Sequence, residues 1–209
     1  MTADDLARAR RVLMRRDAIL APIITRYGAC GIKTGRETDI FTGLVEAIVS
    51  QQLSTRAAAT IHGRLRALIP GGGLPTPEAL LALSDEALRG VGLSRQKTSY
   101  MRDLSGKVLD GSVKTDGLSA LDDEAIVAEL TKVKGIGRWT VEMILIFQLA
   151  RPDVLPVGDL GIVKAIQKAY GLRKTPDAKR MLAIAEPWRP YRSVASWYLW
   201  ASLAEKDGK

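Results

Sequence analysis

The chain is nearly devoid of cysteine and histidine, the side chains that disulfides, zinc and iron–sulfur sites and serine–histidine catalytic pairs require. Its 209 residues include one cysteine, Cys30, and one histidine, His62. A single cysteine excludes an intrachain disulfide, a four-cysteine zinc site and a cysteine-ligated iron–sulfur cluster, and sparse cysteine is typical of a reducing compartment. A single histidine leaves no histidine–carboxylate metal site and no evident serine–histidine pair. We therefore expect no zinc, no iron–sulfur cluster and no organic cofactor.

Long apolar runs are also missing, and no run reaches membrane-spanning length. The first 28 residues, MTADDLARARRVLMRRDAILAPIITRYG, interleave acids and arginines with apolar residues. A secretory leader instead has a basic start followed by an uninterrupted apolar stretch. We expect this segment to form an amphipathic helix that packs on the body of the protein.

The bulk composition is that of a globular protein with an excess of positive charge. Hydrophobic residues make up 46% and charged residues 26% of the chain, and the net charge is +8. This length is enough to bury a core, as one domain or as two small lobes. A basic excess of this size favours a polyanionic partner such as nucleic acid.

Helical periodicity dominates the sequence. One apolar helix face is formed by Phe41, Leu44, Val45, Ile48 and Val49, which recur at three-and-four spacing. No period-two stretch of β-branched residues is long enough to predict a strand, and no repeat of solenoid length is present. The sequence predicts an all-α fold of about ten helices in two lobes with a cleft between them.

The segment VKGIG, residues 133–137, lies between two predicted helices. Gly135 and Gly137 flank Ile136, whose side chain can fill the seam between the helices. Without Cβ atoms the glycines allow a tight turn and close approach of another backbone, and the N–H groups that open the next helix form an anion site. A DNA phosphate fits there, and an ordinary helix–turn–helix corner is the alternative that this motif alone leaves open.

Two longer segments carry a family resemblance. The stretch LTKVKGIGRWTVEMILIF…RPDVLPVGDLGIVKAI resembles the signature of the helix-hairpin-helix (HhH-GPD) DNA glycosylase superfamily: a hairpin, then an aspartate in a Gly/Pro-rich loop. The stretch VEAIVSQQLSTRAA is similar to the helix and loop that this family inserts at a lesion. The resemblance covers roughly residues 40–205 and implies one glycosylase domain over 1–209. Lobe one would lie at roughly 35–115 with the wedge loop, and lobe two at roughly 116–205 with the N-terminal helix at 1–30.

One position indicates the branch of the superfamily. Bifunctional members, which also cut the DNA backbone, carry a lysine shortly after the hairpin, where this chain has Trp139. A Schiff base needs a nucleophilic amine, and indole has none. Tryptophan there, with WRPYRSVASWYLW near the end, resembles the alkylation-repair branch, 3-methyladenine DNA glycosylase II. The resemblance implies a monofunctional enzyme without lyase activity.

The resemblance assigns catalysis to Asp159. An N-alkylated purine already carries positive charge and leaves as a neutral base, so the general acid that O-glycosidic hydrolysis uses is not required. A single carboxylate can then stabilise the developing oxocarbenium ion and orient or deprotonate water. Local sequence alone instead favours Asp159 as the N-cap of a helix that begins at Leu160. The two roles are compatible, because capping would also hold the carboxylate in place.

An enzyme of this kind flips its target nucleotide out of the duplex and fills the gap. The resemblance places the wedge in QQLS, with Gln52 or Leu53 entering the stack, and leaves open that Leu53 is a core residue. Electron-rich rings would hold the cationic purine. The candidate pocket residues are Trp139, Trp200, Met143, Trp188 and Tyr191. Core packing is the alternative for each tryptophan, and Met143 stands where relatives can carry an aromatic ring.

Phosphate contacts are expected at the hairpin and at a second glycine-turn segment, GLSRQK. The candidates are Gly135, Gly137, Arg138, Lys134, Lys132, Arg95 and Lys97. Arg189 and Arg192 are weaker candidates, and solvated surface charge is the alternative for the side chains. The resemblance also implies a structural monovalent cation, Na⁺ or K⁺, held by the main-chain carbonyls of Thr131, Val133 and Ile136.

These observations predict a monofunctional DNA glycosylase that removes 3-methyladenine, and also 7-methylguanine, from duplex DNA and so initiates base excision repair. The alternatives are a glycosylase for another damaged base and a non-catalytic helix-hairpin-helix module that binds DNA. The expected partner is duplex DNA with alkylated bases, and we expect a monomer that does not bind membranes. The expected location is the nucleoid-containing cytoplasm in a bacterium or archaeon, and the nucleus in a eukaryote.

Overall fold

The computed structural model describes residues 1–33 and 39–204 and divides them between two compact units. Unit 1 comprises the described residues of Met1–Arg36 and Leu145–Lys209, and unit 2 those of Glu37–Ile144. The described residues form helices, turns and loops and contain no strand, which confirms the all-α prediction. They hold twelve α-helices rather than about ten. Within this part of the chain, no helix has the length and apolar character needed to cross a membrane.

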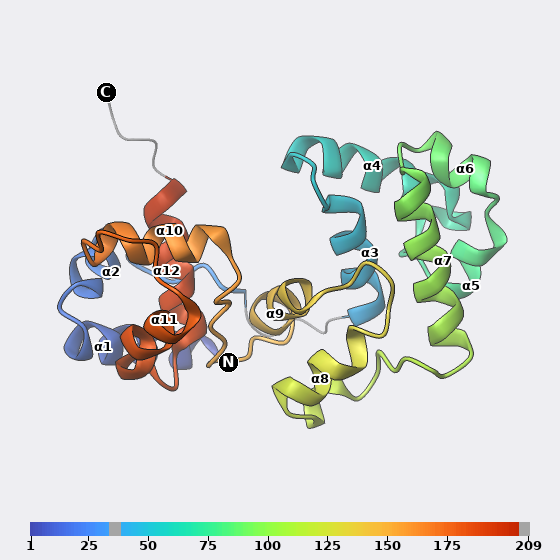
Figure 1. Ribbon diagram of the computed structural model, residues 1–209. Helices are drawn as coiled ribbons and strands as arrows, with labels where there is room; N and C mark the ends of the chain where they lie inside the picture. Colours follow the sequence, from blue (N-terminus) through green and yellow to red (C-terminus); the bar gives the residue numbers. More distant parts are fainter. Residues whose placement is uncertain (34–38, 205–209) are drawn as a thin grey trace. The chain divides into compact units, whose positions relative to one another are not determined.

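Unit 2 is built around the long helix α7, residues Arg95–Leu109 (Figure 1). Its helices are α3 (Ile40–Ser50), α4 (Thr55–Leu68), α5 (Pro77–Ala82), α6 (Asp85–Gly90), α7 (Arg95–Leu109) and α8 (Asp123–Leu130), with 3-10 turns at Pro70–Gly72 and Leu118–Ala120. α3, α5 and α6 all pack against α7. The apolar face of α3 is buried, as its periodicity predicts.

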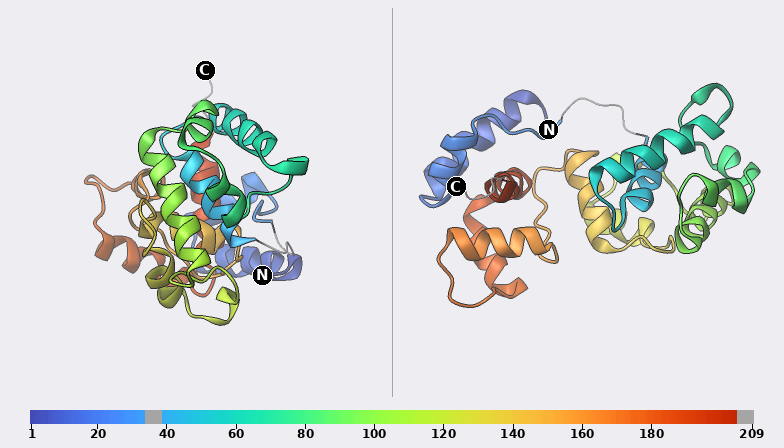
Figure 2. Two further views of the ribbon diagram at one scale, coloured as in Figure 1. Left: turned by 90° about the vertical axis from the view of Figure 1, so that its right-hand side faces the viewer. Right: turned by 90° about the horizontal axis from the view of Figure 1, so that it is seen from above.

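Unit 1 brings the N-terminal helices onto the C-terminal ones. Its helices are α1 (Ala3–Arg16), α2 (Leu20–Tyr27), α10 (Leu160–Ala169), α11 (Ala178–Ala185) and α12 (Arg192–Ala204), with a 3-10 turn at Glu186–Trp188. α12 packs against α1, α2 and α10, and α1 and α2 lie side by side (Figure 2). α9 (Arg138–Phe147) begins in unit 2 and ends in unit 1.

The N-terminal segment differs from the single helix expected from its sequence, because it breaks at Asp17. The N–H of Asp17 closes α1, and its carboxylate accepts hydrogen bonds from the N–H groups of Ile19 (2.9 Å) and Leu20 (3.0 Å). The same carboxylate, 8% exposed, accepts the indole N–H of Trp188 at 2.7 Å. A buried carboxylate needs such donors, and one of them, the indole N–H of Trp188, comes from a residue 171 positions away in the chain.

Helix starts follow the capping residues seen in the sequence. Ser54, Thr76 and Asp122 accept hydrogen bonds from the first turns of α4, α5 and α8. Thr175–Pro176 has the residue types of a helix start, but α11 begins at Ala178 with Asp177 as its N-cap.

The two units differ from the two predicted lobes in one segment. Residues 116–144, which we expected in lobe two, belong to the same compact unit as residues 39–115. The reason is packing against α7, because Asp103 and Lys107 on that helix hydrogen-bond to the backbone of the hairpin. The predicted start of lobe one near residue 35 and the end of lobe two at 205 lie outside the described residues.

Candidate functional site

Asp159 ends a loop, residues 148–159, and caps α10. Its Oδ1 accepts a hydrogen bond from the N–H of Ile162 at 2.7 Å, which confirms the N-cap prediction. The same oxygen accepts the indole N–H of Trp200, on α12, at 2.9 Å. Two donors from two helices therefore set the orientation of one carboxylate, and charge-assisted bonds of this kind are stronger than neutral ones.

Gly161 makes room for this arrangement. A Cβ atom at position 161 would lie 2.9 Å from Oδ1 of Asp159 and 3.2 Å from Cδ1 of Trp200. Gly158, in the same loop, has open space around its own Cβ position. The two glycines look alike in the sequence, and only Gly161 is required by the geometry of the acid.

Trp200 also stacks on a ring that sequence reasoning missed. Phe147, the last residue of α9, has its ring centre 5.6 Å from that of Trp200, at an interplanar angle of 34°. Phe147 is 42% exposed, which is unusual for a residue that the apolar pattern of its helix assigns to the core. Its exposure, together with its ring partner, makes it a further candidate pocket residue in unit 1.

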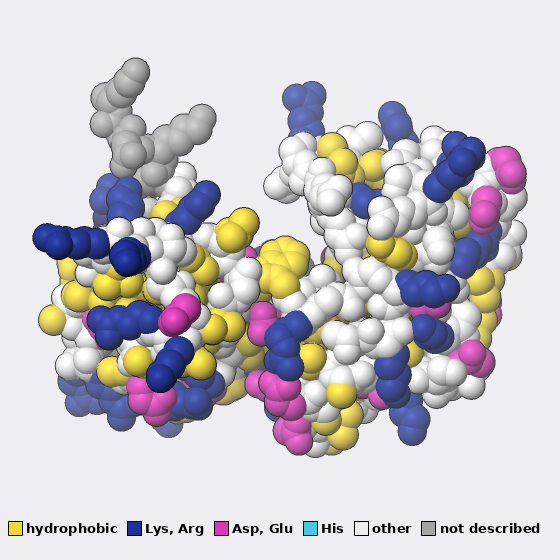
Figure 3. Space-filling model, in the orientation of Figure 1, with side chains coloured by type: hydrophobic (Ala, Val, Ile, Leu, Met, Phe, Trp, Pro, Cys, Tyr) yellow, Lys and Arg dark blue, Asp and Glu magenta, His cyan; other side chains and the backbone are white. Residues whose placement is uncertain are grey.

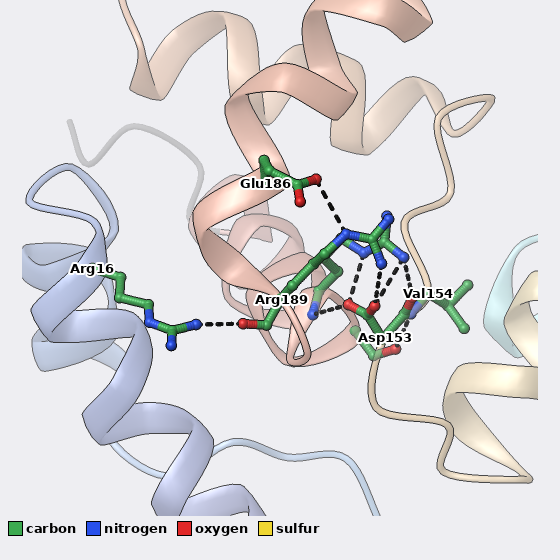
Figure 4. A network of polar contacts seen from close by, with 7 residues as sticks. Arg16, Asp153, Val154, Glu186 and Arg189 are labelled. Carbon is green, nitrogen blue, oxygen red and sulfur yellow. Dashed lines mark hydrogen bonds and ion pairs between the residues drawn. The ribbon is translucent and has the colours of Figure 1, made fainter.

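A dense polar network anchors the loop that leads to Asp159 (Figure 4). Asp153 accepts hydrogen bonds from Arg192 at 2.7 and 3.0 Å and from Arg189 at 2.7 Å, and its main-chain carbonyl accepts another from Arg192 at 2.8 Å. The N–H of Val154 donates to the hydroxyl of Ser193 at 2.9 Å. Arg189 and Arg192, our weaker phosphate candidates, are thus committed to this loop, and Asp153 organises it.

The structure corrects one predicted pocket residue in unit 1. Trp188 is fully buried, and its indole N–H donates to Asp17, so it is a core residue and cannot form a pocket wall. Tyr191 lies half-buried just before α12 and remains a candidate. The sequence signal was the same for both, namely an aromatic residue in a C-terminal motif, and burial distinguishes them.

In unit 2 the wedge loop, residues 51–54, joins α3 to α4. Gln52 is exposed and adopts φ +57°, a left-handed conformation that non-glycine residues seldom take. Leu53 is 39% exposed, so the alternative that it is a core residue is wrong. Both candidate wedge residues therefore stand at the surface, and the backbone strain is at Gln52.

Beside the wedge loop lies a hollow of about 560 Å³, formed entirely within unit 2. Its lining residues are Ala47, Ser50, Gln51, Gln52, Leu53, Trp139, Thr140 and Met143. Trp139 is 48% exposed and Met143 half-buried, and both face this hollow. Two predicted pocket residues and both predicted wedge residues therefore share one concave surface.

The hairpin, residues 131–137, connects α8 to α9, and its two glycines differ. Gly135 has φ +78°, and a Cβ there would lie 2.2 Å from the ring of Tyr100. Its carbonyl accepts the side-chain amide of Gln51 at 2.8 Å. Gly137 has open space around its Cβ position, and Ile136 is 4% exposed, as expected for a residue that fills the seam between the helices.

The predicted phosphate-binding cations have partners inside the protein. Arg138 forms two hydrogen bonds to Glu124, at 2.8 and 2.7 Å, and Lys132 pairs with Glu129 at 2.6 Å. The ammonium group of Lys134 lies 3.7 Å from Asp103. The three cations are half exposed or more, but only the Arg138–Glu124 pair is exposed on both sides. An exposed ion pair contributes little to stability, so Arg138 can exchange Glu124 for a phosphate at low cost. Figure 3 shows Lys and Arg side chains scattered over the surface that it draws of each unit, with acidic side chains among them.

The structure does not support Lys97 as a phosphate contact. Its ammonium group donates to the carbonyls of Val49 (2.7 Å) and Gln51 (2.6 Å), and burial lowers its pKa. Lys97 is half-buried, and its ammonium group supports the end of α3 and the wedge loop instead of extending into solvent toward a phosphate. Arg95, at the first position of α7, is exposed and remains a phosphate candidate.

The proposed cation ligands are main-chain carbonyls in the turn after α8. Hard monovalent ions prefer such oxygen donors, and Thr131, Val133 and Ile136 offer three within six residues. The Val133 carbonyl also accepts the N–H of Ile136 at 3.1 Å, and its second lone pair suits an ion. Among the described residues, no group of three or more His, Cys, Asp or Glu side chains could hold a metal ion.

Comparison with known proteins agrees with this geometry. The chain is 37% identical over 165 residues to DNA-3-methyladenine glycosylase 1 of Schizosaccharomyces pombe, covering 78% of this chain and 72% of that protein. The solved structure of a 3-methyladenine DNA glycosylase from the same yeast, in complex with abasic DNA, matches with a TM-score of 0.83 and 32% identity, over 97% of this chain and 99% of that one. A DNA-3-methyladenine glycosidase from Bacillus halodurans matches with a TM-score of 0.79 and 36% identity, over 93% of this chain and 88% of that one. Residues 45–190 match the HhH-GPD superfamily itself, and the chain therefore belongs to the HhH-GPD superfamily of base excision DNA repair proteins.

Proposed function

We propose that this protein is a monofunctional DNA glycosylase that hydrolyses the N-glycosidic bond of alkylated purines in duplex DNA. The principal substrate is 3-methyladenine, and 7-methylguanine is a second one. The names of its relatives support this substrate class. The observation that carries the mechanism is the carboxylate of Asp159, whose Oδ1 is held by a backbone N–H and an indole N–H.

The chemistry needs only one acid because the leaving group is already a cation. Alkylation at a ring nitrogen makes the purine positively charged, and it departs as a neutral base without protonation. The sugar then develops oxocarbenium character, which a preorganised negative charge stabilises. Asp159 supplies this charge and orients the water that attacks the anomeric carbon. Because two donors hold the carboxylate beforehand, it does not reorganise during the reaction.

Unit 2 supplies the means to extract the base. The exposed pair Gln52 and Leu53 enters the base stack where the nucleotide has left, which makes flipping less costly. Trp139, half exposed beside the wedge loop, offers an indole face that attracts the cationic purine. Met143 lines the same hollow with a flexible, polarisable thioether in place of an aromatic ring.

The hairpin binds the sugar–phosphate backbone of the DNA. The N–H groups at the start of α9 and the open space around Gly137 suit a phosphate, and Arg138 and Lys134 exchange their acidic partners for it. The carbonyls of Thr131, Val133 and Ile136 would hold a monovalent cation that adds positive charge near that phosphate.

We also propose that the enzyme has no lyase activity, because Trp139 cannot form a Schiff base. It acts as a monomer, because a single chain contains the catalytic Asp159, the wedge loop and the hairpin that binds phosphate. It acts where the genome lies, which is the cytoplasm of a bacterium or archaeon and the nucleus of a eukaryote.

The decisive experiment is release of free bases from methylated duplex DNA, measured with enzyme in excess. Wild type should release 3-methyladenine, and Asp159→Asn should lose at least about a hundredfold in rate, because an amide carries no charge. The matched control is Asp177→Asn, since Asp177 caps α11 by the same kind of bond, at 2.7 Å to the N–H of Arg180. The control should excise normally.

Three results would contradict this function. Equal activity of Asp159→Asn and wild type would remove the proposed role of the acid. Salt-sensitive DNA binding without base release would instead indicate a binding module. A covalent protein–DNA adduct trapped by borohydride would indicate lyase chemistry.

A further inference from the structure

One face of α7 contacts both of the surfaces that the proposed function assigns to DNA. Lys97, Tyr100, Asp103 and Lys107 follow one another at spacings of three, three and four, which places them along one side of the helix. Each of the four contacts either the wedge loop with its supporting helix or the hairpin.

The contact at the wedge end is made by Lys97. Its ammonium group binds the carbonyls of Val49 and Gln51 at 2.7 and 2.6 Å, in the last turn and C-cap of α3. Helix C-termini carry unpaired carbonyls and partial negative charge, so a cation there is stabilising. The loop that Lys97 closes holds Gln52 at φ +57°, a conformation that persists only where its surroundings enforce it.

The contacts at the hairpin end are made by the other three residues. The Tyr100 ring lies against Gly135, the Asp103 carboxylate accepts the N–H of Lys134 at 2.8 Å, and Lys107 donates to the carbonyl of Lys132 at 2.6 Å. Burial alone would raise the pKa of Asp103, but the hydrogen bonds from Lys134 and Lys107 outweigh it and lower that pKa.

Gln51 completes the connection between the two ends. Its main-chain carbonyl accepts from Lys97, and its side-chain amide donates to the carbonyl of Gly135 at 2.8 Å. A chain of contacts therefore runs from Lys97 through Gln51 to the hairpin turn, entirely within unit 2.

We propose that Lys97 is a positioning residue that, through Gln51, fixes the position of the wedge loop relative to the hairpin. The inference rests on the proposed function, because it gives the wedge and the hairpin their roles. When the hairpin binds a phosphate, the wedge loop is already ordered at the position from which its side chains reach the base stack. The wedge then enters the stack without a separate ordering step. Lys97 itself does not contact DNA.

The test compares Lys97→Met with Lys97→Arg, Gln51→Met and a control, Lys179→Met. Lys179 is an exposed lysine on α11, outside the proposed machinery, and its replacement removes the same charge. Lys97→Met should lower the single-turnover excision rate at saturating DNA by about tenfold, because a small misplacement of a positioning group has effects of that order or larger. Its affinity for undamaged duplex should change by less than about twofold, because non-specific binding depends on phosphate contacts that Lys97 does not make.

Two further readouts separate positioning from a loss of folding. Fluorescence of 2-aminopurine beside an abasic analogue should report weaker flipping in Lys97→Met, with partial recovery in Lys97→Arg. In the DNA-free protein, the amide of Leu53, which donates to the carbonyl of Ser50 at 3.2 Å, should exchange faster in Lys97→Met and Gln51→Met than in the control. If Lys97→Met does not fold, the same measurements on Gln51→Met test the inference.

Normal excision and normal Leu53 exchange in both Lys97→Met and Gln51→Met would overturn the inference. A uniform loss of affinity for all DNA, with flipping unchanged, would also overturn it, because Lys97 would then be a phosphate contact. Failure of wild type to release bases would contradict the proposed function instead, and the exchange measurement would still test the support of the loop.

Discussion

Replacing Gly161 with alanine would test how closely the acid must be held. The new Cβ would lie 2.9 Å from Oδ1 of Asp159, and a relaxed carbon–oxygen contact is longer by several tenths of an ångström. The carboxylate must turn away, and in turning it weakens its bonds from Ile162 and Trp200, now 2.7 and 2.9 Å. The substitution removes no polar group, so any effect reports position alone.

The magnitude follows from those bonds. A hydrogen bond to a charged group contributes about 1.5 to 3 kcal/mol. At about 1.4 kcal/mol for each factor of ten, loss of one such bond in the transition state slows excision by about 10- to 100-fold. Two effects on stability oppose each other. Gly161 is the second residue of α10, where alanine favours a helix by up to about 1 kcal/mol, and the weakened N-cap bond to Ile162 costs about as much, so stability should change little.

The assay is release of 3-methyladenine with enzyme in excess, together with a thermal melt of each variant. Gly158→Ala is the matched control, since its Cβ would meet nothing within 4 Å, and it should excise at the wild-type rate. Gly161→Ala should melt near the wild-type temperature and excise slowly. Equal excision by both variants would refute the idea that the two donors fix a catalytic carboxylate.

Three further predictions follow from the same structure. Trp200→Phe keeps a ring beside Phe147 but removes the donor to Asp159, so single-turnover excision should fall about tenfold, and an unchanged rate would deny the indole N–H a role. Gly135→Ala should lower the free energy of unfolding in urea by about 3 kcal/mol, because φ +78° and the Tyr100 ring both oppose a Cβ, and a loss below about 1 kcal/mol would contradict this reasoning. Burial raises the pKa of the Cys30 thiol from 9.0 to about 11, so its alkylation by iodoacetamide near pH 8, followed by mass spectrometry, should be about a hundredfold slower than that of an unperturbed thiol. Rapid labelling of Cys30 would show that the thiol is accessible and ionised.

The tryptophans show where sequence reasoning stops. Trp139, Trp188 and Trp200 all stood in motif positions, and core packing was an open alternative for each. Trp188 proved fully buried against Asp17, Trp139 is 48% exposed beside the wedge loop, and Trp200 donates to Asp159. Burial and partner choice depend on residues more than 40 positions away, which local sequence does not reveal.

Lys97 shows the same limit for charge. GLSRQK looked like a phosphate-binding turn because its glycine turn followed by basic residues resembles the hairpin. Its ammonium group instead supports the C-terminal end of α3, 46 residues earlier in the chain. A lysine with a long stem can reach a distant carbonyl, and only the packing of α7 against α3 decides whether it does.

The amino-acid sequence by itself determined the helical class, most helix starts, the hairpin turn and the capping position of Asp159. These features depend on hydrogen bonds and contacts within a few residues, so the local pattern contains them. The tertiary structure alone decided that Trp200 would hold the acid, that Gly161 had to lack a side chain, and that α7 would connect the wedge loop to the hairpin. Those features arise where segments far apart in the chain pack together, and the geometry of that packing is set by the whole core.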